Sequence, residues 1–362
     1  MERHRRPDWL LMLLPILIFM VGLFFVHSAS RTAGGGWDSS LAIKQFCWML
    51  IGIGVMLVTV KFPYRFLQDW AWPLYGSVLF LLVLVLFMPS RLGARRWIDL
   101  GFFSLQPSEL AKVAVIIALA YLLKSRNIAR EGLSAAFLPA VATFVPMLLI
   151  LKEPDLGTGL LLVPVLLAML YVSAFRMRWI LTLFGIAAAA APFLYNHLKD
   201  YQKLRILNFL NPDRDPLGSG YNIIQSKIAI GSGGFWGKGL LEGSQTQLRF
   251  LPERHTDFIF SVIGEEGGFI ACAFVLIALA IIMHRGYRIA QDCPGRFGRL
   301  LAVGITTLLA SQAIINISMT MGLVPVVGMP LFFVSYGGSS IVAKMFLVGI
   351  LVNIGMHRDS AV

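Results

Sequence analysis

Long apolar runs follow one another along most of this chain, separated by short polar segments. Ten runs are long enough to cross about 30 Å of hydrocarbon as helices. They cover residues 9–27, 45–60, 72–88, 108–123, 135–151, 158–174, 179–195, 264–283, 300–320 and 331–356. A longer and more polar segment, at about 196–262, separates the seventh run from the eighth. The pattern predicts an all-α integral membrane protein of about ten transmembrane helices, with one large loop between helices 7 and 8.

The Lys and Arg residues predict the orientation. If the N-terminus is inside, the short cytoplasmic segments hold more than twice as many Lys and Arg as the short outer loops. Cytoplasmic loops of membrane proteins carry this excess, and long loops are largely exempt. Both termini are therefore predicted to be cytoplasmic and the 196–262 loop periplasmic. The first run exceeds the usual apolar length of a cleaved signal peptide, so it is interpreted as a retained helix, and residues 1–362 as one polytopic domain.

Composition supports the membrane class. Apolar residues make up 57% and charged residues 14% of the 362 residues, and the mean hydropathy is +0.75. The net charge of +12 lies mostly in short segments between apolar runs, which favours contacts with membrane lipids over nucleic acid. The isolated cysteines Cys47, Cys272 and Cys293 form no CxxC pattern, so neither a disulfide framework nor a zinc site is expected.

Charged side chains cluster in the predicted outer loops and at the outer ends of helices. Arg95 and Arg96 precede Trp97 in the loop after the third run. Guanidinium groups make bidentate contacts with phosphate oxygens, so this group suits a pyrophosphate headgroup. An interfacial aromatic belt that contacts lipid phosphates is the alternative.

Two further acidic positions have both structural and functional interpretations. Glu109 and Lys112 are three residues apart on one helix face, as a structural ion pair or a substrate-facing pair. Ser108 is a candidate cap of that helix. Asp155 lies in a tight turn, where it either caps the next helix or holds a divalent cation, Mg²⁺ or Mn²⁺, near a pyrophosphate.

The segment 251–260 holds the strongest candidate for a catalytic base. Asp257 precedes the eighth apolar run, so it either caps that helix or accepts a proton as a general base. His255 is an alternative base or a residue that orients the loop. The nearby glycine-rich stretch 231–239 does not match a Walker A pattern, so it gives little support for nucleotide binding. Residues 334–340 break the last run, and Lys344 inside that run requires a partner.

Together these residues resemble the SEDS family of peptidoglycan polymerases. The matching pieces occur in the family's order and span nearly the whole chain. They are Gly93-Ala94-Arg95-Arg96-Trp97-Ile98, Gln106-Pro107-Ser108-Glu109-Leu110-Ala111-Lys112, Glu153-Pro154-Asp155-Leu156-Gly157-Thr158, Leu251 through Phe260, and Ser335-Tyr336-Gly337-Gly338-Ser339-Ser340. Lys344 departs from the resemblance, in which an uncharged residue is expected.

The resemblance implies a processive glycosyltransferase in the bacterial inner membrane that uses lipid II, with its site facing the periplasm. Asp257 would be the base. Arg95, Arg96 and Lys112 would stabilise the leaving pyrophosphate, and Glu109 and Asp155 would position these groups or a divalent cation. Trp97 and His255 complete the expected substrate-binding set. The implied partners are a class B penicillin-binding protein and other membrane proteins of the elongation complex.

Within the family the chain resembles the elongation branch. It is short, reads Pro252-Glu253-Arg254-His255, and carries Asn211-Pro212-Asp213-Arg214-Asp215-Pro216 with Gly220-Tyr221. The division branch, with the same chemistry, is an alternative. A transporter that flips lipid II is a rival, disfavoured because the charged groups gather on the outer side. A scaffold without catalysis is a weaker rival.

Overall fold

The computed structural model describes residues 6–30, 36, 39–89, 95–99, 101, 104–124, 132–196, 200–211 and 220–357. Every predicted apolar run coincides with a helix or a pair of helices. These are α1 (Trp9–Ala29), α2 (Ser39–Lys61), α4 (Ala71–Val85), α5 (Pro107–Lys124), α7 (Phe137–Lys152), α8 (Leu156–Leu160) with α9 (Leu162–Val172), α10 (Met177–Asn196), α14 (Ile259–Asp292), α15 (Arg296–Thr320) and α16 (Gly338–Met356). The helical fold class is confirmed.

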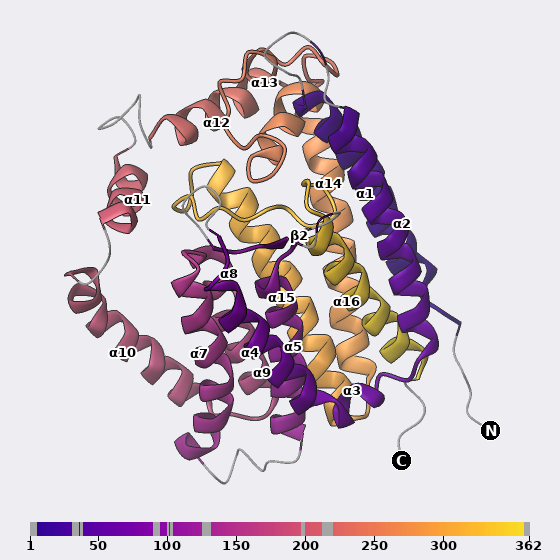
Figure 1. Ribbon diagram of the computed structural model, residues 1–362, viewed down its shortest axis with the longest axis vertical. Helices are drawn as coiled ribbons and strands as arrows, with labels where there is room; N and C mark the ends of the chain where they lie inside the picture. The colour runs from indigo at the N-terminus through magenta and orange to yellow at the C-terminus, as the bar shows by residue number, and fades with distance from the viewer. Residues whose placement is uncertain are drawn as a thin grey trace.

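Not all of these helices have the length of a membrane span. In the described part of the chain, six helices are long and apolar enough to cross a membrane, and the segments Ala71–Val85 and Leu156–Val172 are shorter apolar helices. The count of ten crossings and the cytoplasmic termini stay predictions. Figure 1 places the start of α1 and the end of α16 at the same end of the bundle, as the orientation requires.

The bundle is built around α5 and α15. Helix α5 packs against α4, α7, α9, α15 and α16, and α2 packs along α16. Nearly every residue of α5 is buried, including Glu109 and Lys112. A helix that is apolar on all sides belongs in a protein interior. Helices α10 and α11 run along one side of the bundle (Figure 1).

Shorter elements gather at the end of the bundle that carries α12 (Tyr221–Ser232) and α13 (Ser244–Gln247), which we call the loop end (Figure 1). The predicted long loop also contains α11 (Asp200–Leu210). Strands β1 (Ile98–Asp99) and β2 (Ser104–Leu105) form an antiparallel hairpin between α4 and α5, and α3 (Phe66–Asp69) and the 3-10 turn η1 (Gly132–Ala136) complete the elements. Gly93, Ala94 and residues 212–216 lie outside the described residues.

Helix α14 is broken near its start, and the glycine-rich stretch fills the break. Gly268 has φ 65° and ψ −163°, which no helix contains. The backbone N–H of Lys238 donates to Glu265 O at 3.0 Å, and the N–H of Phe269 donates to Gly234 O at 3.0 Å. At Gly237, where φ is 82°, a Cβ would stand 2.1 Å from Glu266 O. The stretch is therefore a packing element that satisfies backbone groups left by the break.

The acidic pair at the start of α14 reinforces the same junction. The carboxylate of Glu265 accepts hydrogen bonds from Lys238 Nζ at 2.9 Å and from the backbone and hydroxyl of Thr246 at 3.0 and 2.8 Å. Glu266 Oε1 accepts from Ser28 Oγ at 2.5 Å. Both residues therefore tie the loop end to α14 and α1.

The last apolar run is broken, as predicted, but the non-helical segment covers residues 331–337 instead of 334–340. Helix α16 begins at Gly338, and residues 331–337 form turns instead. Ser335 Oγ accepts from Leu331 N at 2.8 Å and donates to Thr256 O at 2.6 Å. Gln45 of α2 brackets the segment, because its Nε2 donates to Ser335 O at 2.9 Å and its Oε1 accepts from Gly337 N at 3.1 Å.

We expect Gly237→Ala to lower the free energy of unfolding by about 2 kcal/mol or more, because a Cβ there meets a backbone oxygen at a positive φ. Gly231→Ala is the control, since Gly231 lies within helix α12 and a Cβ there would have no atom within 4 Å. Thermal unfolding of both purified variants in detergent measures the difference. Equal melting temperatures of the two variants would contradict the conclusion that the glycine-rich stretch packs closely against the break in α14.

Candidate functional site

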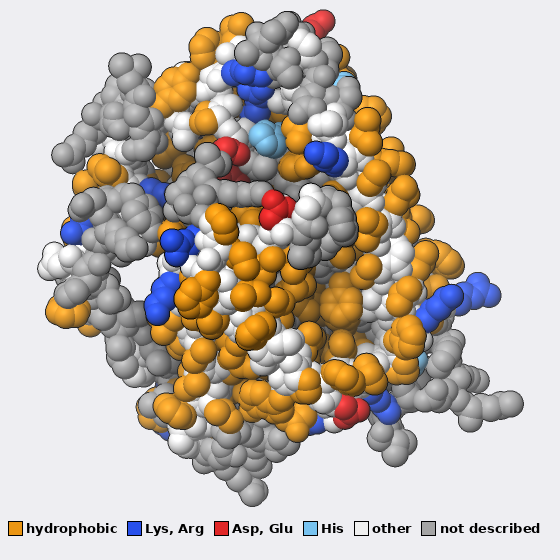
Figure 2. Space-filling model, viewed as in Figure 1, with side chains coloured by type: hydrophobic (Ala, Val, Ile, Leu, Met, Phe, Trp, Pro, Cys, Tyr) orange, Lys and Arg blue, Asp and Glu red, His pale blue; other side chains and the backbone are white. Residues whose placement is uncertain are grey.

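A cavity of about 370 Å³ lies at the loop end, where loops from distant parts of the sequence converge. Its lining combines the hairpin, the starts of α5, α8 and α16, and the segments before α14 and after α15. The lining residues are Arg96, Trp97, Gln106, Glu109, Asp155, Thr158, Arg205, Glu253, Thr256, Asp257, Val327, Gly328, Pro330, Tyr336, Gly337 and Ser340. Figure 2 shows acidic and basic side chains gathered on this part of an otherwise largely apolar face.

Asp257 does not cap α14, so that alternative is wrong. The helix begins at Ile259, and its N-cap position is Phe258, with no side-chain cap hydrogen bond. The backbone of Asp257 is fixed instead, because its N–H donates to Glu253 O at 3.1 Å and its carbonyl accepts from Asn316 Nδ2 at 3.0 Å. The carboxylate lines the cavity.

The carboxylate of Asp257 is tuned for proton transfer near neutral pH. Burial and the neighbouring Glu253 and Asp155 charges together raise the pKa of Asp257 to about 7, against the opposing effect of Arg96 and Arg205. A base whose pKa lies near the working pH combines an ionised population with a useful proton affinity. Gly328 leaves room for this group, since a Cβ there would stand 3.3 Å from Asp257 Oδ2.

The hairpin separates the two arginines that the sequence groups together. Arg96 lines the cavity and donates from Nε to Glu153 O at 3.2 Å and from Nη2 to Pro154 O. Arg95 is exposed, and its Nη1 donates to Leu86 O at 2.8 Å outside the cavity. Trp97 joins Arg96 in the lining.

Glu109 is the shared partner of two lysines. Lys112 Nζ donates to Glu109 Oε1 at 2.7 Å, and Lys344 Nζ donates to Glu109 Oε2 and to Ser340 Oγ, the latter at 3.1 Å. The side chains are 1–3% exposed. The ion-pair interpretation of Glu109 and Lys112 is confirmed, and Lys344 has the partner that it requires. Glu109 and Ser340 also line the cavity, whereas Lys112 is not among the lining residues of this described cavity.

Asp155 caps a helix and also lines the cavity. Its Oδ1 accepts from Thr158 N at 3.2 Å at the start of α8, so the capping interpretation is confirmed. Its Oδ2 accepts from Gln106 Nε2 at 3.4 Å. Ser108, in contrast, does not cap α5. That helix begins at Pro107, which leaves the buried Ser108 hydroxyl inside the first turn without a hydrogen-bond partner among the described residues.

His255 supports the loop from behind. Its ring meets the ring of Tyr336 edge-on at 6.0 Å, and its carbonyl accepts from Tyr336 N at 2.9 Å. Burial lowers the pKa of His255, so the imidazole is neutral near pH 7. The side chain is absent from the lining of the described cavity, which favours the orienting role over that of a base.

Sequence reasoning did not single out two charged residues of the cavity lining, nor the buried carboxylate of Glu153. Arg205 of α11 and Glu253 line the cavity. Arg205 lies outside every quoted motif, whereas Glu253 lies within the 251–260 segment. The carboxylate of Glu153 is fully buried and neither oxygen has a hydrogen-bond partner among the described residues. Burial and the Asp155 charge raise the pKa of Glu153 to about 9, against Arg96.

The described residues do not bring together three or more His, Cys, Asp or Glu side chains in a metal-binding arrangement. The carboxylate oxygens of Asp155 accept hydrogen bonds from Thr158 and Gln106. Because Mg²⁺ prefers several oxygen ligands in octahedral geometry, this arrangement fits a divalent cation poorly. The three cysteines, all within the described residues, form no disulfide with one another; Cys47 is exposed and the other two are buried.

The whole chain resembles known proteins. The family described as "Cell cycle protein" matches residues 8–360. The peptidoglycan glycosyltransferase MrdB of Escherichia coli strain K12 is 41% identical over 357 residues, which cover 98% of this chain and 94% of the relative. A probable peptidoglycan glycosyltransferase FtsW of Trichlorobacter lovleyi is 42% identical over 354 residues, with 96% and 92% coverage.

A solved structure shares the fold. It comes from work on the structural coordination of polymerization and crosslinking by a peptidoglycan synthase complex, and it is 33% identical in sequence. The TM-score is 0.84, and the match covers 98% of this chain and 99% of the other. The similarity therefore extends over nearly the whole length of both chains.

We expect Glu153→Gln to make stability less sensitive to alkaline pH. The pKa of Glu153 is higher in the folded state than in the unfolded chain, so stability falls as the pH rises from about 4.5 to about 9. Glutamine stays neutral, and the variant should melt above the parent at pH 8 and close to it at pH 5. Exposed Glu242→Gln controls for net charge. Parallel melting curves for variant and parent would contradict the prediction.

Proposed function

This chain belongs to the FtsW/RodA/SpoVE family and is a peptidoglycan glycosyltransferase, and we propose that the loop-end cavity polymerises lipid II through Asp257. The observation that carries the proposal is the Asp257 carboxylate. It lines the cavity, takes no part in helix capping, and has a pKa of about 7. A general base must be within reach of the substrate, and it is most effective when its pKa lies near the working pH.

In the proposed reaction, the 4-hydroxyl of the acceptor GlcNAc attacks C1 of the MurNAc that ends the lipid-linked strand. The Asp257 carboxylate accepts the hydroxyl proton as the new O4–C1 bond forms. The bond from C1 to the pyrophosphate oxygen breaks, and undecaprenyl pyrophosphate leaves with the electron pair. The product linkage is β-1,4, because attack opposite the leaving group inverts C1.

Cations at the cavity suit the departing pyrophosphate. Arg96 and Arg205 line the cavity with Asp257, and fixed positive charge stabilises negative charge that develops in a transition state. Lys112 acts at one remove, through Glu109, and Asp155 holds the α8 turn and Gln106 in place. Arg95 is assigned to headgroups at the rim, because it points out of the cavity. No step is assigned to a divalent cation.

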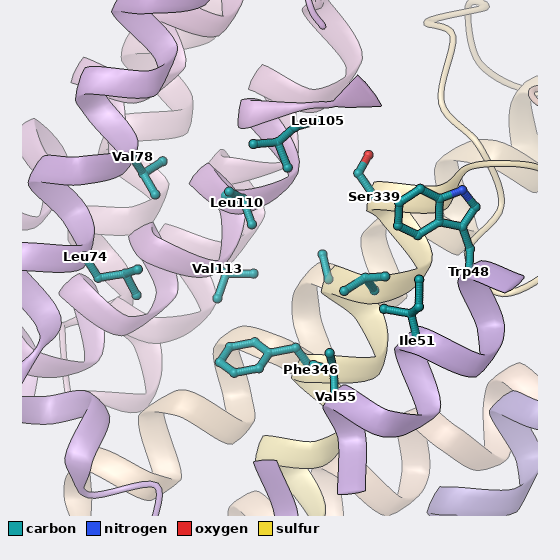
Figure 3. Close-up of a pocket in the computed structure, with 12 residues that line it drawn as sticks. Trp48, Ile51, Val55, Leu74, Val78, Leu105, Leu110, Val113, Ser339 and Phe346 are labelled. Atoms are coloured by element: carbon teal, nitrogen blue, oxygen red, sulfur yellow. The ribbon is translucent and has the colours of Figure 1, made fainter. Parts of the chain in front are cut away.

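An apolar cavity beside the polar one suits the lipid chain. It measures about 350 Å³ and lies between α2, α4, α5 and α16 (Figure 3). Its lining includes Leu105, Leu110 and Ser339, whose sequence neighbours Gln106, Glu109 and Ser340 line the polar cavity. A polyprenyl chain in this groove would leave its pyrophosphate at the entrance to the polar cavity.

The comparisons support a general statement about the partner and the location, and the more specific statements below are proposals. The chain is a multi-pass membrane protein, and its structural relative belongs to a complex that coordinates polymerisation and crosslinking. We propose a class B penicillin-binding protein as the partner, together with other elongation-complex membrane proteins. The proposed location is the bacterial inner membrane, with the loop end in the periplasm.

Cell elongation, the role of the RodA branch, is the proposed process. The support is the motif at residues 252–255, since identities of 41% and 42% do not separate MrdB from FtsW. The lipid II transporter is the second candidate. It is less well supported, because the described polar cavity lies at one end of the bundle and the relatives are named glycosyltransferases.

We expect Asp257→Asn to abolish glycan synthesis while the protein folds as before. The amide matches the carboxylate in shape but cannot accept the proton. The assay supplies labelled lipid II to the purified protein with its class B partner and separates glycan chains by gel electrophoresis. Glu242→Gln is the matched control at an exposed position. Glycan ladders from Asp257→Asn at equal melting temperature would rule out this base.

The rate of polymerisation should rise with pH between about 6 and 8 and then level off, since only deprotonated Asp257 acts as a base and its pKa is about 7. Asp155→Asn keeps a capping oxygen but removes a charge that raises the pKa of Asp257. The midpoint of the profile should therefore move to lower pH in that variant. Initial rates at saturating lipid II test this, and an unmoved midpoint would contradict it.

A further inference from the structure

We infer that Ser340, positioned by Lys344 at the start of α16, forms a subsite for a phosphate oxygen of the lipid-linked pyrophosphate. The inference deepens the proposed function and rests on it. It concerns Lys344, where the chain departs from its family resemblance and carries a charge in place of the expected uncharged residue. The ligand class is a pyrophosphate anion, either free or esterified to a lipid.

The first argument is the charge balance beneath the cavity. Glu109 is the one carboxylate that the described structure pairs with Lys112 and Lys344, and all three side chains are at most 3% exposed. With both lysines protonated, the cluster carries one positive charge in excess. Glu109 can neutralise only one of these two charges, so a negative group in the adjoining cavity, either a lining carboxylate or a ligand anion, would offset the other.

The second argument is the Ser340 hydroxyl. Lys344 Nζ can only donate, so Ser340 Oγ is the acceptor in their 3.1 Å hydrogen bond. The hydroxyl proton is then directed to a different acceptor, and the described residues supply none. Ser340 lines the cavity, so an acceptor oxygen of a ligand there can take this proton. Lys344 thereby acts through Ser340 and is a positioning residue.

The third argument is the helix that presents them. Helix α16 has 19 residues, and its N-cap residue is Gly337, which has no side chain that could cap the helix. The first backbone N–H groups of a helix lack intrahelical partners and favour an anion. Gly337 and Ser340 line the same cavity as Arg96. A pyrophosphate, with oxygens on two phosphorus atoms, can therefore contact the hairpin and α16 together.

Binding to the purified full chain tests the inference without requiring polymerisation. The ligands are inorganic pyrophosphate and undecaprenyl pyrophosphate, measured by titration calorimetry in detergent. We expect Lys344→Met and Ser340→Ala each to weaken binding about tenfold, the usual effect of a lost charge-assisted hydrogen bond. The double variant should have about the same affinity as either single variant, because the two residues act as one unit. Lys344→Arg should recover part of the affinity.

Asn353→Leu is the control on the same helix. Its side chain donates to Val60 O at 2.8 Å and Phe62 O at 2.9 Å, far along α16 from Ser340, so it alters stability but not binding. Variants of Lys344 and Ser340 that melt lower yet keep parental affinity would overturn the inference and leave a structural ion pair. If the variants lose affinity for both ligands, the subsite binds the pyrophosphate itself. If they lose affinity only for undecaprenyl pyrophosphate, the subsite binds a pyrophosphate headgroup that the lipid chain holds in place. A parent that binds but makes no glycan would instead overturn the proposed function.

Discussion

Inside a bilayer, a polar group must find its partner within the protein, and this constraint shapes the loop end. The carboxylate of Glu109 on α5 pairs with Lys112 on the same helix and with Lys344 on α16, so that one carboxylate joins the two helices. The broken start of α14 meets the same constraint through the glycine-rich stretch, whose backbone pairs with the carbonyls and N–H groups of the break. Both solutions bring irregular backbone and charged side chains into a buried region, where they can border a cavity.

The cavity uses the same constraint for chemistry. Burial and two nearby carboxyl groups shift the proton affinity of Asp257, and Arg96 and Arg205 moderate that shift. Arg96 is itself held by the carbonyls of Glu153 and Pro154, so the cation and the turn that carries Asp155 share one support. The groups that set the basicity of Asp257 therefore come from three separate loops, and no one loop would suffice.

The helices could be predicted from the sequence because apolar runs of this length have few alternatives in a membrane protein. Asp257, Arg96 and Asp155 were found because their motifs follow one another in the order of a known family. Three features could not be predicted. The outward direction of Arg95 depends on its hydrogen bond to the Leu86 carbonyl, which no motif indicates. The fully buried state of Glu153 depends on packing around a turn, and the place of Arg205 in the cavity depends on the position of α11. Ser108 and Asp257 show that a residue just before an apolar run need not be a cap.

The segment 331–337 connects parts of the molecule that the sequence keeps far apart. The side chain of Gln45 in α2 forms hydrogen bonds with the backbone of Ser335 and Gly337. The segment in turn donates hydrogen bonds to the carbonyls of His255 and Thr256, which directly precede Asp257. Helix α2 also contributes Trp48 and Ile51 to the apolar groove. Helix α2 thus borders the apolar cavity and, through Gln45, also fixes the segment that supports the loop of Asp257. One helix therefore belongs to the supports of both cavities, so a substitution that displaces α2 would alter the two together.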